Sequence, residues 1–194
     1  MSTPIKQSLV YCSVAAVLGL ITAVYPNELE TSKEGLAFIA KWENCTTNAY
    51  KDIVGVCTGG IGSTRDLDGK PIKMGRTLTT DEVARLFVRD VKEAEQCVFK
   101  QFDGMNLPQP VFDSVVSLVY NNGCYGTRWN RTHNRPTSIQ RAATAGDWEK
   151  VCYHLGDFIN AGGKPSKGLI NRRTEEQRMC LRYKQEQPIW RNLK

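Results

Sequence analysis

Histidine is scarce in this sequence, because His133 and His154 are the only two. Neither stands at metal-ligand spacing from another histidine or a cysteine, so a zinc hydrolase is not indicated. The chain also lacks a glycine loop that ends in lysine, the motif that holds nucleotide phosphates. A thiol hydrolase would need a cysteine close to a histidine in space, and no local nucleophile motif points to one. We therefore expect no metal and no cofactor.

Repeats and disordered segments are absent as well. With 194 residues, of which 41% are hydrophobic and 24% charged, the chain can bury a proper core. This core could belong to one domain or be shared by two small lobes. No feature indicates an oligomer, and we expect a monomer.

Charge is missing from the 21 residues between Lys6 and Glu28. A helix of about 20 apolar residues crosses a bilayer, so residues 8–26 are expected to lie in a membrane. The run exceeds the apolar core of a cleaved signal, and no small-x-small cleavage site follows it. Its serine, glycine, threonine and alanine residues make it a poor anchor. We interpret residues 1–28 as a releasable signal anchor; an ordinary anchor or a signal peptide remains the alternative.

Basic residues dominate the C-terminal part of the chain. From Arg128 to Lys194 there are 14 Lys and Arg against six Asp and Glu. A solvated basic face, an anionic cell wall or a membrane surface would each account for this excess. No nucleic-acid motif and no interleaved aromatic residues accompany the arginines, so no nucleic acid is expected as a partner.

The chemistry is expected in the segment ENCTTNAYKDIVGVCTGGIG. Glu43 and Asp52 supply two carboxylates there, and Thr58 adds a hydroxyl. Hydrolysis of a glycosidic bond needs such a pair, because one group donates a proton while the other organises water or stabilises positive charge on the sugar. An acid pair by itself is weak evidence.

Glu43 continues an apolar helix face, since Leu36, Ile39 and Ala40 precede it at helical spacing. Desolvation at the end of such a face raises the pKa of a carboxyl, as a general acid near neutral pH requires. The alternative is a glutamate that turns to water at a frayed helix end. Without Asp52 that alternative would be preferred.

Residues 48–63 lose the helical period and read as strands punctuated by glycines. Gly55 is expected to turn this hairpin, with Asp52 before the turn and Thr58 after it. The two side chains can then face each other across the ladder. The hairpin would form a small lobe.

Two capping boxes predict helix starts, one from Thr31 and Glu34 and one from Thr79 and Glu82. The second helix would run for about 20 residues. Further helical patterns follow in PVFDSVVSLVYNNG, TSIQRAATAG, DWEKVCYHLGDF and GLINRRTEEQRMCLRY. The sequence thus predicts one strand-bearing stretch in an otherwise helical protein.

The seven cysteines indicate export, because disulfides persist in the periplasm and are rare in the cytosol. They are Cys12, Cys45, Cys57, Cys97, Cys124, Cys152 and Cys180. If the membrane hides Cys12, the other six can pair; once Cys12 emerges, its thiol can attack a bridge. The expected bridges are Cys45–Cys57, Cys97–Cys180 and Cys124–Cys152. An ordinary hairpin staple is the alternative for the first.

The spacing of Glu43, Asp52 and Thr58 in AYKDIVGVCTGGIG resembles the catalytic triad of the T-even phage type lysozymes. LTTDEVARLFVRDV, SLVYNNG, NAGGKPSKGL and GLINRRTEE follow in the family's order. The resemblance implies an α+β fold with a cleft between a small β-hairpin lobe and a larger helical lobe, preceded here by an N-terminal apolar helix. Residues 29–194 would form the catalytic domain.

The apolar N-terminus narrows the resemblance to the signal-anchor-release endolysins. This implies an exported muramidase, first tethered to the inner membrane and then released into the host periplasm for lysis. Its substrate would be the β-1,4 bond between N-acetylmuramic acid and N-acetylglucosamine of peptidoglycan. Glu43 would be the general acid, Asp52 the second carboxylate and Thr58 a water-positioning hydroxyl, with inversion at the sugar. Asn121, within SLVYNNG, would bind substrate.

Some release endolysins carry a catalytic cysteine where this chain has Asp52, so blocking of a catalytic sulfur is excluded here. Our hypothesis is that a Cys45–Cys57 bridge distorts the triad loop until Cys12 attacks Cys45 or Cys57. Two alternatives remain: a catalytically inactive wall-binding protein, and a membrane-tethered interaction protein with structural disulfides.

Overall fold

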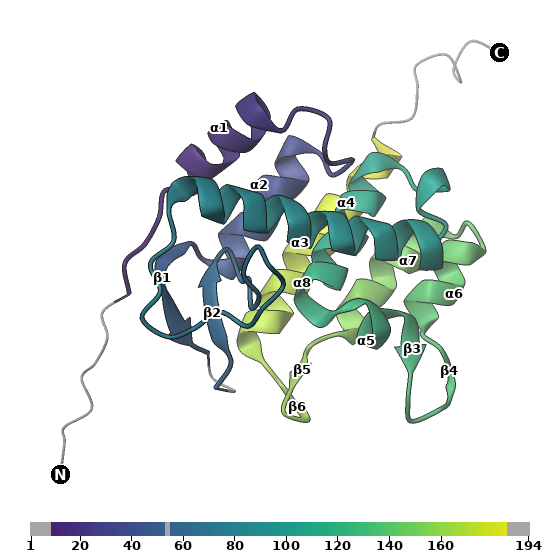
Figure 1. Ribbon diagram of the computed structural model, residues 1–194. Coiled ribbons are helices and arrows are strands. Elements are labelled where there is room, and N and C mark those ends of the chain that lie inside the picture. The colour runs from purple at the N-terminus through teal and green to yellow at the C-terminus, as the bar shows by residue number, and fades with distance from the viewer. Residues whose placement is uncertain (1–8, 53–54, 186–194) are drawn as a thin grey trace. The chain divides into compact units, whose positions relative to one another are not determined.

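The computed structural model of the chain describes residues 9–52 and 55–185 (Figure 1). Helices in this part are α1 (Val14–Val24), α2 (Lys33–Glu43), α3 (Thr80–Gln101), α4 (Gln109–Asn122), α5 (Cys124–Arg128), α6 (Ser138–Thr144), α7 (Trp148–His154) and α8 (Lys167–Cys180). Three short 3-10 helices lie at Gly104–Asn106, Leu155–Asp157 and Leu181–Lys184. The strands form three antiparallel hairpins: β1 (Thr46–Lys51) with β2 (Cys57–Gly60), β3 (Trp129–Asn130) with β4 (Arg135–Pro136), and β5 (Asn160–Ala161) with β6 (Lys164–Pro165).

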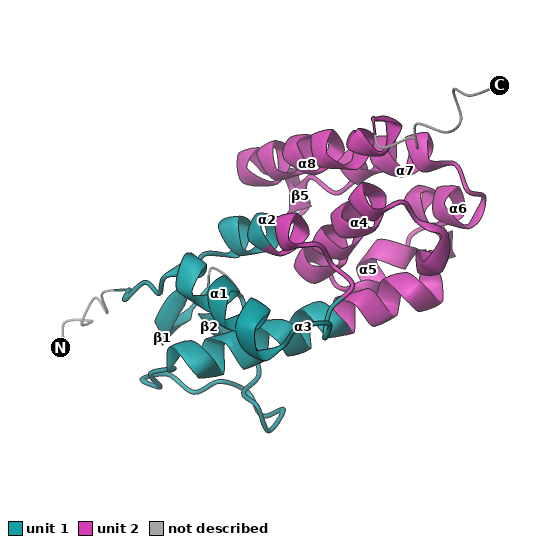
Figure 2. Cartoon of the chain, turned by 90° about the horizontal axis from the view of Figure 1, so that it is seen from above, with its two compact units in different colours: residues 1–29, 37–92 teal, residues 30–36, 93–194 magenta. Residues whose placement is uncertain are grey.

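The chain divides into two compact units (Figure 2). Unit 1 comprises residues 1–29 and 37–92 and contains the β1–β2 hairpin; unit 2 comprises residues 30–36 and 93–194 and is mostly helical. A small hairpin unit and a larger helical unit are what the sequence predicts, and the α+β class is confirmed.

The residues before α1 are built into unit 1. Cys12 donates its backbone N–H to the carbonyl of Cys45, and Thr47 donates to the carbonyl of Val10, at 3.0 and 2.8 Å. Tyr11 forms an antiparallel β-bridge with Thr46, so this segment pairs alongside β1. It therefore belongs to the folded body of unit 1.

Helix α1 follows directly and buries one face, since Val17 is fully buried and Ile21 is 4% exposed. Ser13 caps it by accepting the N–H of Ala16 at 3.2 Å. It is 11 residues long. Among the helices of residues 9–52 and 55–185, none has both the length and the apolar character needed to cross a membrane. The membrane-spanning helix expected over residues 8–26 therefore stays a prediction.

One of the two expected capping boxes forms. Thr79 donates its N–H to Glu82, and Glu82 returns an N–H to the Thr79 hydroxyl, at 2.8 and 3.1 Å. The box at the start of α2 is wrong, because Ser32 caps this helix by accepting the N–H of Gly35. Thr31 instead donates both its N–H and its hydroxyl to the buried carboxyl of Glu95.

The core of unit 2 gathers around α4, whose residues from Pro110 to Val119 are all buried. Helix α8 runs beside α4 and delivers a buried Arg172, Arg173 and Glu176 to it. Both arginines donate to the Glu176 carboxylate. Ser117 of α4 adds a hydrogen bond of 2.7 Å to the same carboxylate. This carboxylate is thereby well satisfied, as a buried charge must be.

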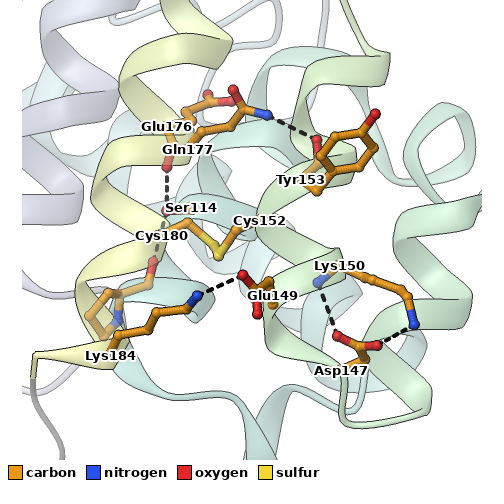
Figure 3. Close-up of a disulfide and its surroundings, with 11 residues drawn as sticks. Ser114, Asp147, Glu149, Lys150, Cys152, Tyr153, Glu176, Gln177, Cys180 and Lys184 are labelled. Carbon is orange, nitrogen blue, oxygen red and sulfur yellow. Dashed lines mark hydrogen bonds and ion pairs between the residues drawn. A yellow bond between two sulfur atoms is a disulfide. The ribbon is translucent and has the colours of Figure 1, made fainter.

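The expected pairing of the helical cysteines is wrong. The bridges are Cys97–Cys124 and Cys152–Cys180. The first links α3 to the start of α5 within unit 2. The second links α7 to α8, which pack against each other in the same unit (Figure 3). Helical periodicity could not reveal which helices are neighbours.

Candidate active site

Glu43 is the last residue of α2 and is partly buried. The apolar face predicted to lead to it is real, because Leu36, Ile39 and Ala40 are all buried. Asn44 then takes a left-handed conformation with φ 59°, which ends the helix at the carboxyl-bearing residue. The helix thus holds Glu43 at a fixed position where the chain turns into β1.

Gly62 makes room for the Glu43 carboxyl. A Cβ atom at this position would lie 3.1 Å from Oε2 of Glu43, and the backbone has φ +77°. Both the close approach and the left-handed conformation favour glycine. The segment that follows β2 therefore lies against the carboxyl of Glu43.

Asp52 follows β1 and shapes the hairpin turn. Its N–H donates to the carbonyl of Val56 at 2.9 Å, and its carbonyl accepts from Gly55 at 3.0 Å. Its own Oδ1 accepts the N–H of Val56 at 2.8 Å. Gly55 has φ +84°, so the prediction that it lies in the turn is confirmed.

Thr58 is a buried residue of β2, 6% exposed, and its direct cross-strand partner is Tyr50. Side chains two apart on a strand share a face, so Asp52 lies on the same face as Tyr50 and Thr58. Asp52 and Thr58 are hence diagonal neighbours on this face. The Thr58 hydroxyl donates to the carbonyl of Val56 at 3.4 Å.

Tyr50 was missed by the sequence analysis. Its pKa is raised, first by burial and then by the negative charges of Glu43 and Asp52. Both candidate carboxylates therefore act on the hydroxyl of one side chain, which itself pairs with Thr58 across the hairpin. The signal in the sequence was its place two residues before Asp52, on the same strand face.

A hydrogen bond from Ser63 to helix α3 holds the segment that follows β2. This serine is almost fully buried and donates its hydroxyl to Oδ2 of Asp90 at 2.5 Å. Its backbone exchanges two hydrogen bonds with Gly59. Arg89 forms an ion pair with the same Asp90 at 2.7 Å. The segment that carries Gly62 is thus fastened on both sides.

Asn121 lies in unit 2, near the end of α4, and its side chain is exposed. Its Oδ1 accepts a hydrogen bond from Nη2 of the buried Arg173. Arg173 also donates to the carbonyl of Phe158 at 3.1 Å and to the carboxylate of Glu176. The orientation of the Asn121 side chain is thereby tied to the buried network of unit 2.

The cysteines of unit 1 differ from the expectation for the anchored chain. Cys12 is bonded to Cys45, and Cys57 carries a free thiol that is partly exposed. The Cys45–Cys57 bridge is not formed in this structure. The Cys12–Cys45 bridge is one of the two that our hypothesis allows for the chain after release.

His133 is exposed in the β3–β4 turn, and His154 pairs with Asp157 at 2.9 Å. Within residues 9–52 and 55–185, no group of three or more His, Cys, Asp or Glu side chains could hold a metal ion.

A sequence model of the phage lysozyme family matches residues 40–176. The chain belongs to this family, and the expectation of an enzyme of the lysozyme class is confirmed. It is 36% identical over 183 residues to the SAR-endolysin of Haemophilus phage HP1, which covers 90% of this chain and 96% of that protein. It is 32% identical over 174 residues to the SAR-endolysin of Escherichia phage P1, covering 87% and 91%.

Two solved structures are similar to this chain over most of its length. The chain is similar to the crystal structure of the active form of P1 phage endolysin Lyz, with a TM-score of 0.79, 30% identity and coverage of 90% of this chain and 96% of that one. An endolysin from Escherichia coli O157:H7 phage FAHEc1 gives a TM-score of 0.67 at 29% identity, over 79% and 94%. The fold is therefore lysozyme-like.

Proposed function

We propose that this chain is an exported phage endolysin that cleaves the β-1,4 bond between N-acetylmuramic acid and N-acetylglucosamine. Glu43 acts as the general acid, Asp52 as the second carboxylate and Thr58 as the hydroxyl that positions water. One observation carries this proposal: the negative charges of Glu43 and Asp52 both raise the pKa of Tyr50, and the backbone of Tyr50 is paired in register with that of Thr58 on the hairpin. Two carboxylates beside one polar face suit glycosidic hydrolysis.

The chemistry proposed for these residues is the one that the resemblance to the phage lysozymes implies. Glu43 protonates the leaving oxygen of the glycosidic bond, while Asp52 takes a proton from a water that attacks the anomeric carbon from the opposite face. The Thr58 hydroxyl orients that water, and the configuration at the sugar inverts. In unit 2, Asn121 contacts the glycan strand.

Export and release complete the proposal. Residues 1–28 tether the chain to the inner membrane, as the SAR-endolysin names of its relatives suggest. Residues 29–194 act in the periplasm on peptidoglycan after release. The packing of the segment before α1 against β1 supports this order, because that segment cannot pair with β1 and lie in a bilayer at once.

Activation occurs by disulfide exchange. The Cys12 thiolate attacks the sulfur of Cys45 in a Cys45–Cys57 bridge, the Cys12–Cys45 bond forms, and Cys57 leaves as a thiolate. No external oxidant or reductant is needed. The product has the bonds found here, a Cys12–Cys45 bridge and a free Cys57. The similarity to an active form of a relative supports the same assignment.

The hairpin register explains how the earlier bridge would inhibit. Thr46, directly after Cys45, pairs with Gly60, whereas Cys57 pairs with Lys51 at the other end of the ladder. Three residues of strand span about 10 Å, and bridged Cα atoms lie within about 7 Å. A Cys45–Cys57 bridge therefore requires that this register be broken, which displaces Asp52 and Thr58.

The catalytic test is the zymogram on peptidoglycan. Glu43→Gln keeps the size of the side chain and removes the proton donor, so we expect a loss of at least about a hundredfold in turnover. Glu149→Gln, in an exposed ion pair with Lys184, is the matched control and keeps full activity. Full activity of Glu43→Gln would remove Glu43 as the acid.

The test of activation compares two variants. Cys12→Ser leaves the Cys45–Cys57 bridge without an attacker and is expected to be inactive after export. Cys12→Ser combined with Cys57→Ser leaves Cys45 without a partner, and activity should return. Disulfide mapping before and after release identifies the bonds. If Cys12→Ser lyses the host on time, the exchange mechanism is wrong.

A catalytically inactive, membrane-tethered wall-binding protein is the alternative. It would bind sacculi without releasing reducing sugar, so the same zymogram separates the two functions.

A further inference from the structure

The ring of Tyr125 in unit 2 holds two arginine side chains. The guanidinium carbon of Arg128 lies 5.2 Å from the ring centroid, and that of Arg131 lies 4.8 Å from it. Both distances fall within the range of cation–π attraction. The ring is 43% exposed, so the two cations are held at the surface.

Arg135 lies in the same short stretch, where helix α5 leads into the β3–β4 hairpin (Figure 1). Its cross-strand partner is Asn130, and the Arg135 side chain is exposed. Along the chain, the nearest acidic residues are Asp113 and Asp147. We call Tyr125, Arg128, Arg131 and Arg135 the Tyr125 cluster.

The arginines of the Tyr125 cluster form no ion pair with any carboxylate in the described part of the chain. Some other basic residues of unit 2 do pair with carboxylates: Arg172 and Arg173 with Glu176, and Lys150 with Asp147. The cluster is thus a local excess of positive charge with its geometry already set by the ring.

This arrangement suits an anion. Two guanidinium groups within 5.2 Å of one centroid are at most twice that distance apart, so they repel each other. A carboxylate bound near both groups would relieve that repulsion and accept bidentate hydrogen bonds from a planar fork. Since the ring restricts both side chains beforehand, less rotamer entropy is lost on binding.

We infer that the Tyr125 cluster binds the carboxylates of the stem peptides of peptidoglycan. This inference rests on the proposed function, because it names a contact to the same polymer outside the catalytic residues. The cluster would raise the residence time of the enzyme on the wall between cleavage events.

A phospholipid surface fits the cluster less well. Interfacial sites combine basic residues with exposed apolar side chains that enter the bilayer. In residues 124–136 the exposed large hydrophobic side chain is Tyr125, and its ring already holds two guanidinium groups.

The experiment uses the full chain and purified sacculi in two forms, native and with all carboxyls converted to neutral amides. We expect Arg128→Gln combined with Arg131→Gln to raise KM on native sacculi about threefold to tenfold and to leave kcat unchanged. On amidated sacculi the wild type should fall to the level of the variant, and the variant should change little. Such non-additivity assigns the effect to arginine–carboxylate contacts.

Arg141→Gln combined with Arg178→Gln is the matched control. It removes the same charge from exposed positions on α6 and α8 and should behave as wild type on both substrates. A loss shared by the control would mean a bulk charge effect and would overturn the inference. An equal loss for the cluster variant on amidated sacculi, or no loss on native sacculi, would also overturn it.

Co-sedimentation separates failure of this inference from failure of the proposed function. If the wild type releases no reducing sugar, the function fails, yet the cluster variant should still sediment less with native sacculi. Vesicles of phosphatidylglycerol form a second arm. If the variant loses vesicle binding but keeps sacculus binding, the occupant is lipid and the inference is wrong.

Discussion

Arg173 donates a hydrogen bond through Nη2 to Oδ1 of Asn121, from a buried position to an exposed one. A guanidinium has no acceptor, so the amide of Asn121 can satisfy it only with its oxygen. The amide nitrogen lies on the other branch of the planar group, away from Arg173. Asn121 therefore presents N–H donors to a ligand, and Arg173 fixes that orientation.

Asn121→Asp tests this orientation, because aspartate keeps the oxygen that faces Arg173 and replaces the outer amide by a second oxygen. We expect KM on peptidoglycan to rise about fivefold, the cost of one lost hydrogen bond, with Tm unchanged or higher. Asn122→Asp makes the same chemical change on the adjacent exposed residue and should leave KM as it is. Equal KM values for Asn121→Asp and wild type would exclude a donor role.

Gly62→Ala should impair activity more than stability. A Cβ here would press on the Glu43 carboxyl at 3.1 Å, and φ +77° adds about 1–2 kcal/mol of backbone strain. Because Glu43 must move, we expect kcat to fall at least about tenfold.

Gly69→Ala separates the two effects of that substitution. Gly69 has φ +78°, and a Cβ atom at this position would have no neighbour within 4 Å, so its strain is the same and its surroundings are unaffected. It should lose similar stability in urea denaturation and keep its kcat. A parallel loss of kcat in both variants would show that strain alone accounts for the effect.

Local features could be predicted from the sequence, and features that depend on distant residues could not. Thr79 and Glu82 cap each other because both lie in one turn. Thr31 has the same spacing to Glu34, but the buried Glu95, 64 positions along the chain, takes both of its donors. A sequence motif indicates only the hydrogen bonds that a segment can form by itself. Here the buried carboxyl of Glu95, from α3, binds Thr31 in place of Glu34.

The same contrast between local features and contacts of distant residues applies to the candidate active site. Periodicity placed Glu43 at the end of a buried face, and glycine placed the hairpin turn at Gly55. The packing of Gly62 on Glu43 and the partners of Cys97 and Cys152 depend on which elements are neighbours. No spacing in the sequence encodes those contacts.

Tyr50→Phe should shift the pH dependence of catalysis. The neutral Tyr50 hydroxyl lies in the field of Glu43 and Asp52, and a dipole there stabilises a nearby carboxylate. Without it, the acid limb of kcat/KM should move to higher pH. Tyr153→Phe, at an exposed position on α7, is the control. An unchanged profile would remove Tyr50 from the site's electrostatics.

Glu95 and Glu82 should affect stability with opposite dependence on pH. Burial raises the pKa of Glu95 above 4.5, so the folded state favours its protonated form. The free energy of unfolding should therefore fall as pH rises from that value through the folded pKa. Glu95→Gln stays neutral, and its urea-denaturation profile between about pH 4 and about pH 7 should lack this fall.

The pKa of Glu82 is lowered from 4.5 by the N–H of Thr79 and by Arg76. Its contribution is thus present above that value and is lost as pH falls through the folded pKa. Glu82→Gln should cost about 0.5–1 kcal/mol near neutral pH and nothing at low pH, because glutamine can still accept from Thr79 but lacks the charge that pairs with Arg76. When the free energy of unfolding of each variant is compared with that of the wild type, the effect of titrating groups that both proteins contain drops out. Differences of the same sign for Glu82→Gln and Glu95→Gln across this range would contradict the assignment of one carboxyl to burial and the other to hydrogen bonding.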